Sequence, residues 1–140
     1  MAQPPAYPLS LRRKLRLAAR VWLSLVHMRL RMLRSPLPRV AESLADGRPR
    51  RYRSEYSPAT LSRAVHRWLQ VGGRRPTCLI SSLVLMDLLR GQGEPAELVI
   101  GLPPQAADHR AHAWVELEGR DVGPPPGRGE HVPLARFGGD

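Results

Sequence analysis

The single cysteine of the chain, Cys78, stands where a helix is predicted to begin. Thr77 directly before it is a residue type that caps helix N-termini, and an apolar run follows. Unpaired N–H groups and the helix dipole stabilise a thiolate there, and the same N–H groups can bind the oxyanion formed when a thiolate attacks a carbonyl. A lone cysteine is more often an inert core residue. Assigning Cys78 as a nucleophile therefore requires a second residue that could act as its base.

His112 is the candidate base. It lies in the segment Ala111 to Glu118, whose alternation of apolar and polar residues is typical of a β-strand. A histidine on a strand beside the cysteine-bearing helix can accept the thiol proton and return it to a leaving amine. The alternative is a satisfied core histidine. The Thr77 cap, the first-turn position of Cys78 and the later strand together favour a catalytic pair.

A third catalytic group is harder to assign. Asp121 is the nearest acid, but a hairpin that turns at Glu118-Gly119 pairs it with Glu116, roughly 13 Å along the strand from His112. Unless a bulge or a longer turn shifts that register, the third member is missing, or is a backbone carbonyl or a water. The other candidate acids are Asp108, Glu130 and, less readily, Asp87 in the middle of a helix.

A metal site is poorly supported. His109 and His112 have an H-x-x-H spacing, but one cysteine and no cluster of further ligands accompany them. We therefore expect no metal and no cofactor. Three further histidines have no recognisable constellation around them and are assigned to surface or helix positions: His27, His66 and His131.

The N-terminal helix is amphipathic and basic. Ser10 is a candidate cap, and the helix is expected to run to about Arg34. Helical spacing predicts one apolar stripe, made of Leu11, Leu15, Ala18, Trp22, Leu25, Val26, Leu30 and Leu33. A basic amphipathic helix can lie on a membrane or pack on its own domain. The second is commoner, and we expect it here.

The remaining elements predict an α+β fold. A helix follows Ser57-Pro58, a buried central helix runs from Cys78 to about Arg90, and strands cover Pro95–Gly101, Ala111–Glu118 and a short return after Gly119. Residues 1–57 read as a tail, the amphipathic helix and an irregular connector from Pro36 to Ser57. The core is assigned to residues 58–123, and residues 124–140 to a Pro/Gly-rich tail.

Composition limits the compartment and the partners. The 140 residues fit one domain. The net charge of +10 fits either a solvated basic surface or an acidic partner, which would be a nucleic acid, an anionic membrane or an acidic peptide, and charge alone does not choose between them. A nucleic acid ranks last, because no recognition motif accompanies the arginines. One cysteine allows no disulfide within the chain and favours a reducing cytoplasm. The apolar run Val21 to Met28 is too short to span a bilayer, which needs about 20 residues.

Two segments together resemble a known family. "CLISSLVLMDLLRGQGEPAELVIGL" followed by "AHAWVELEGRDVG" is similar to the leader peptidases of lasso-peptide biosynthesis, which are stand-alone cysteine proteases with a transglutaminase-like, papain-related core. The resemblance covers about Pro58 to Gly123. It implies that Cys78 is the nucleophile and His112 the base. One departure is that Pro124 stands where the family usually has its acid.

The same resemblance implies partners. Such a peptidase cuts the leader from a ribosomally made precursor, acting with a small separate leader-binding protein and with a cyclase that closes the macrolactam ring. Two other interpretations stay open. One is a catalytically weak module of the same fold that binds the leader or a partner, and the other is a basic nucleic-acid-binding protein.

Overall fold

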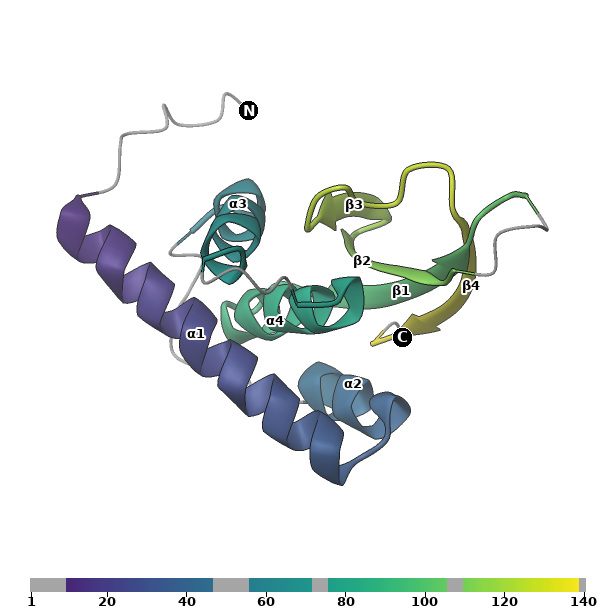
Figure 1. The fold of residues 1–140 in the computed structure, drawn as a ribbon, viewed down its shortest axis with the longest axis horizontal. Helices are drawn as coiled ribbons and strands as arrows, with labels where there is room; N and C mark the ends of the chain where they lie inside the picture. The colour runs from purple at the N-terminus through teal and green to yellow at the C-terminus, as the bar shows by residue number, and fades with distance from the viewer. Residues whose placement is uncertain (1–9, 47–55, 72–75, 106–109, 139–140) are drawn as a thin grey trace.

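The computed structural model describes residues 10–46, 56–71, 76–105 and 110–138 (Figure 1). Within these ranges four helices precede four strands. The helices are α1 (Leu11–Arg34), α2 (Leu37–Asp46), α3 (Pro58–Leu69) and α4 (Cys78–Gly91), and the strands are β1 (Ala96–Leu102), β2 (His112–Leu117), β3 (Arg120–Gly123) and β4 (Val132–Phe137). The strands form one antiparallel sheet in the order β3-β2-β1-β4. The predicted α+β class is confirmed.

Helix α4 is the centre of the core. It packs against β1 and β2 and is flanked by the other three helices (Figure 1). Leu83, Val84, Leu85 and Met86 are fully buried, as the apolar character of this segment predicts. Each such side chain stabilises the fold by about 1.5–3 kcal/mol. The N-terminus of α4 is thereby fixed at the surface of a rigid unit.

Side-chain caps set the starts of the helices where the sequence predicts them. The hydroxyl of Ser10 accepts a hydrogen bond from the N–H of Arg13 at the start of α1. Ser57 does the same for Thr60 at the start of α3, where Pro58 occupies the first helical position and has no N–H to satisfy.

Helix α1 packs on its own domain, as expected, but through a different face from the predicted one. Of the predicted stripe only Ala18 and Leu25 are buried. The remaining members are between 38 and 83% exposed: Leu11, Leu15, Trp22, Val26, Leu30 and Leu33. The contact is made by a second apolar row that includes Leu17, Val21, Leu25 and Met28. Periodicity alone does not tell which of two apolar rows faces the core.

None of the described helices is long and apolar enough to cross a membrane.

The connector expected to be irregular contains helix α2. Pro36 and Pro38 suggest a break in the sequence, but Pro38 falls in the first turn, where a missing N–H is tolerated. Val40, Ala41 and Leu44 share one face and are buried in the core. This burial favours a helix over the predicted irregular chain. Residues 47–55 of the connector lie outside the described ranges.

The segment assigned to a Pro/Gly-rich tail contains strand β4. It pairs with β1 from Leu98↔Phe137 to Leu102↔Val132, with an irregularity between Ile100 and Gly101. Pro133 has no N–H to donate, so a sequence pattern that contains it does not predict a strand. An edge strand tolerates proline, because on one side its backbone groups have no neighbouring strand to hydrogen-bond with. Gly101 allows the close approach, since a Cβ there would collide with the carbonyl oxygen of Val132.

Candidate active site

Cys78 is the first residue of α4. Thr77 caps the helix: its hydroxyl accepts from the N–H of Ile80 at 3.4 Å, and its carbonyl accepts from the N–H of Ser81 at 3.0 Å. Among the described residues these bonds leave the N–H groups of Cys78 and Leu79 as the first-turn donors without an acceptor. The half-buried thiol therefore lies beside two N–H groups that could bind an oxyanion.

His112 begins β2, and its ring orientation is set by a backbone group. Its Nε2 lies 2.6 Å from the carbonyl oxygen of Gly127. A carbonyl can only accept, so Nε2 must carry the hydrogen. In the neutral imidazole Nδ1 is then the acceptor, and this nitrogen could take a proton from a thiol.

One cavity of about 390 Å³ brings the two predicted residues together. Cys78 and His112 both line it, although they are separated by a helix and a strand in the chain. The end of α3, the start of α4 and the loop after β3 complete its wall. The lining residues from these segments are Val65, His66, Leu69, Gln70, Pro76, Ser81 and Pro124 to Pro126. The volume suits a few residues of an extended peptide.

Asp121 does not contact His112. Strand β3 pairs it with Glu116, the register that the hairpin turn predicts, and the irregularity in this pairing lies beyond it, between Val115 and Glu116. Its carboxylate instead accepts from the N–H of Gly123 at 2.8 Å and of Arg128 at 2.7 Å. These two bonds hold both ends of the loop that contains Gly127.

The group that orients His112 is therefore the Gly127 carbonyl, one of the alternatives that the sequence leaves open. Gly127 has a φ of +72°, and a Cβ on it would collide with the Asp121 carboxylate. Only glycine fits both conditions without strain. The Asp121 carboxylate thus affects the His112 imidazole indirectly, because it holds the loop that positions the Gly127 carbonyl.

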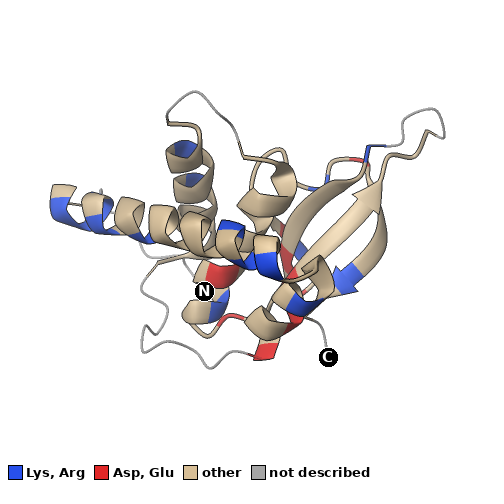
Figure 2. Cartoon of the chain, turned by 60° about the horizontal axis from the view of Figure 1, so that its bottom comes forward, with Lys and Arg blue, Asp and Glu red and all other residues tan. Residues whose placement is uncertain are grey.

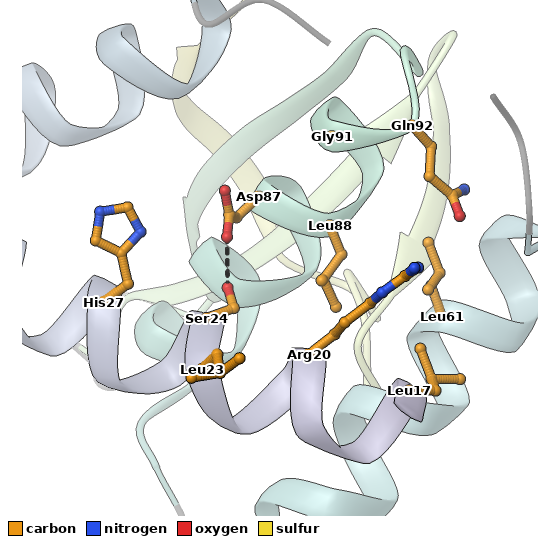
Figure 3. Close-up of a pocket in the computed structure, with 10 residues that line it drawn as sticks. All are labelled: Leu17, Arg20, Leu23, Ser24, His27, Leu61, Asp87, Leu88, Gly91 and Gln92. Carbon is orange, nitrogen blue, oxygen red and sulfur yellow. Dashed lines mark hydrogen bonds between the residues drawn. The ribbon is translucent and has the colours of Figure 1, made fainter. Parts of the chain in front are cut away.

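The other candidate acids do not complete a triad in the described structure. Asp108 lies outside the described residues, and Glu130 is exposed in the turn before β4. Asp87 is buried and accepts a 2.6 Å hydrogen bond from the hydroxyl of Ser24 (Figure 3). Both residues line a separate cavity of about 380 Å³ between α1 and α4. Asp87 belongs to the packing of these helices.

Two histidines that the sequence assigned to surface or helix positions belong to the site. The ring centroid of His131 lies 4.8 Å from that of His112. His66 projects from α3 into the cavity wall, where its ring contacts Gln70. Neither has a sequence signal, because the turn before β4 and the packing of α3 bring them there. His109, half of the H-x-x-H spacing, is outside the described residues.

A buried ionic group supports β2 next to the site. Glu116 is 3% exposed and accepts from Trp114 Nε1 at 3.0 Å and from Arg136 at 2.6 Å. Burial raises the pKa of Glu116, but these two hydrogen bonds and the nearby arginine charges outweigh it, so its pKa lies below the ordinary value. The Trp114 ring in turn stacks at 6.2 Å from His112. Trp114 thus links the ionic group to the imidazole.

In the parts of the chain that the structure describes, no three side chains among His, Cys, Asp and Glu are placed to hold a metal ion. Among known families, the Transglutaminase-like superfamily matches residues 12–135. The matched range reaches from α1 into β4 and contains Cys78, His112 and the loop around Gly127. No curated protein and no solved structure matches the chain.

Proposed function

Since this chain belongs to the transglutaminase-like superfamily, we propose that it is a cysteine peptidase that removes the leader peptide from a ribosomally made lasso-peptide precursor. The observation that carries the chemistry is the cavity shared by Cys78 and His112, in which Nε2 of His112 is hydrogen-bonded to the Gly127 carbonyl. We assign the other ring nitrogen, Nδ1, to the thiol. The substrate class rests on the resemblance of residues 58–123 to lasso leader peptidases.

In the first half of the proposed reaction, His112 Nδ1 takes the thiol proton and the Cys78 sulfur attacks the scissile carbonyl carbon. The N–H groups of Cys78 and Leu79 bind the oxygen as it becomes negative. The C–N bond then breaks, the imidazolium gives its proton to the leaving amine, and a thioester to Cys78 remains.

In the second half, His112 removes a proton from a water that attacks the thioester carbonyl. The C–S bond breaks, the freed sulfur recovers the proton from His112, and a carboxylic acid is released. Throughout both halves the Gly127 carbonyl keeps Nε2 protonated and stabilises the imidazolium through the same hydrogen bond.

The proposed partners are the precursor leader, a small leader-binding protein and the macrolactam-forming cyclase, all in the cytoplasm. A cavity of about 390 Å³ holds only the residues next to the scissile bond. A separate protein that grips the leader would raise the effective concentration of that bond at Cys78. We therefore expect slow cleavage by the chain alone and faster cleavage with the leader-binding protein.

A second candidate is a catalytically weak module that binds the leader or a partner. It is favoured by one observation: His112 is oriented by a neutral carbonyl, which stabilises an imidazolium less than a carboxylate does. This candidate predicts leader binding without turnover.

Cleavage of the precursor, followed by mass spectrometry with and without the leader-binding protein, tests the proposal. Cys78→Ala should abolish cleavage, and His112→Ala should lower it at least ~100-fold. His27→Ala, a histidine that lines the other cavity, is the matched control and should cut normally. Full cleavage by the Cys78→Ala protein would exclude the peptidase. Binding of the leader by the unaltered chain with no product would select the second candidate.

A further inference from the structure

Helix α1 leaves a long apolar row outside the core. We call it the outer stripe, and it consists of Leu11, Leu15, Trp22, Leu23, Val26, Leu30 and Leu33, which are 38–83% exposed. At 3.6 residues per turn these positions gather on the side away from Val21 and Met28, which are fully buried. Scattered exposed leucines are ordinary, but a contiguous apolar surface of this length marks an interaction site.

The charge around the outer stripe has one sign. Helix α1 carries seven arginines and one lysine and no acidic residue. Figure 2 shows this basic character along the helix. Arg12, Arg16 and Arg34 follow one border of the stripe, and Arg29 lies at the other, all of them exposed. Long arginine side chains in such positions can lie along apolar surface and reach out with their charged ends.

We propose that the outer stripe binds an anionic membrane surface. The apolar side chains would enter the region between lipid headgroups and acyl chains, Trp22 would lie at that boundary, and the bordering arginines would contact lipid phosphates. Helix α1 lies along one edge of the molecule, so its whole length of about 36 Å can meet a flat surface (Figure 1). The helix lies on the bilayer and does not cross it.

A second copy of the chain fits the stripe less well. Two outer stripes packed together would bring two rows of arginines close to each other, with no carboxylate on either α1 to neutralise them. An anionic lipid surface supplies the missing charge and also accepts the apolar side chains.

The test uses the full chain and vesicles of phosphatidylcholine, with and without an equal part of phosphatidylglycerol. The protein should sediment with the anionic vesicles and much less with the neutral ones, and high salt should release it. Trp22 fluorescence should shift to shorter wavelength on binding, and Trp22→Phe should remove that shift while most binding remains. Trp68 on α3 is half-buried and Trp114 on β2 is fully buried, and the Trp22→Phe variant measures the combined background of these two tryptophans.

Two triple variants separate the apolar and the charged contributions. Leu15→Gln/Val26→Gln/Leu33→Gln should lower partitioning into anionic vesicles at least ~10-fold. Arg12→Gln/Arg16→Gln/Arg34→Gln should lower it about 100-fold, at roughly fivefold for each arginine near an anionic surface. Val132→Gln/Leu134→Gln alters exposed apolar residues of β4 and is the matched control, with unchanged binding. Circular dichroism checks that each variant is folded.

Three results would overturn the proposal. The first is that the unaltered protein fails to sediment with anionic vesicles, and the second is that the apolar triple variant binds them as tightly as the unaltered protein. The third concerns the oligomeric state. If light scattering instead shows a dimer that the apolar triple variant abolishes, the stripe is an interface between copies and the membrane proposal is wrong.

Discussion

The Nε2 atom of His112 and the carbonyl oxygen of Gly127 lie 2.6 Å apart, so a backbone group occupies the position at which many catalytic histidines meet a carboxylate. The carbonyl fixes the tautomer as an acid would, but it carries no charge. Its placement depends on a loop rather than on a side-chain rotamer.

Gly127→Ala should lower kcat/KM for precursor cleavage at least ~10-fold, or about 1.4 kcal/mol of barrier. The added Cβ collides with the Asp121 carboxylate and forces the loop carbonyl away from His112. Gly129→Ala is the matched control: it has a φ of +55°, but its Cβ meets nothing closer than 3.9 Å. If both variants lose activity equally, loop strain and not the carbonyl position is responsible.

Asp121→Asn should keep activity within about tenfold of the unaltered enzyme, because the residue acts through the loop and not on the imidazole. Asp121→Ala should lose more, since neither backbone N–H keeps an acceptor. Steady-state kinetics of both variants across pH measure this. A loss near 10⁴-fold in Asp121→Asn with an intact fold would instead identify Asp121 as a triad acid in direct contact with His112.

Glu116→Gln should lower the free energy of unfolding at neutral pH by about 1–3 kcal/mol. The folded state holds the pKa of Glu116 below its ordinary value of 4.5, where an unfolded glutamate titrates. The pair with Arg136 therefore stabilises the fold fully above that value, and the stabilisation is lost as the pH falls through the lowered pKa. Urea unfolding at several pH values should show this acid dependence, and it should shrink in the variant.

Glu97→Gln is the control for that experiment. The Glu97 carboxylate is 3.6 Å from Arg136 and 32% exposed, so the loss should stay below about 1 kcal/mol. An equal effect of the two substitutions would mean that burial of Glu116 contributes nothing.

Asp87→Asn should leave precursor cleavage unchanged, because this carboxylate lines the cavity between α1 and α4 and not the one that holds Cys78 (Figure 3). Ser24→Ala should destabilise the fold by about 1–3 kcal/mol, because a buried carboxylate loses its hydrogen bond. Thermal unfolding and cleavage rates of both variants separate the two effects. Reduced kcat in Asp87→Asn at unchanged stability would contradict the structural role.

The sequence predicts the local features well, because each has a local cause. Thr77 and Ser57 cap the helices they precede, and the turn at Gly119 sets the pairing of Asp121 with Glu116. Cys78 and His112 line one cavity, but they come from different elements, and their catalytic roles stay a prediction.

The sequence fails where a long-range contact decides. Helix α1 has two apolar rows, and only the position of α4 selects the one with Val21 and Met28. Strand β4 contains Pro133 and is held by its pairing with β1. The role of Gly127 cannot be predicted from residue type, because its backbone carbonyl and not a side chain contacts His112. His131 lies near His112 only because the segment between β3 and β4 folds back toward β2.

The order β3-β2-β1-β4 places the last strand beside the first, and this has a consequence for how the protein is made. During synthesis the helices and β1 to β3 emerge before β4, and until then one edge of β1 has no partner strand. The loop carrying Gly127 lies in the same late segment. The contact that orients His112 therefore forms only after residues 124–137 have emerged, so a nascent chain holds its thiol long before its histidine is set.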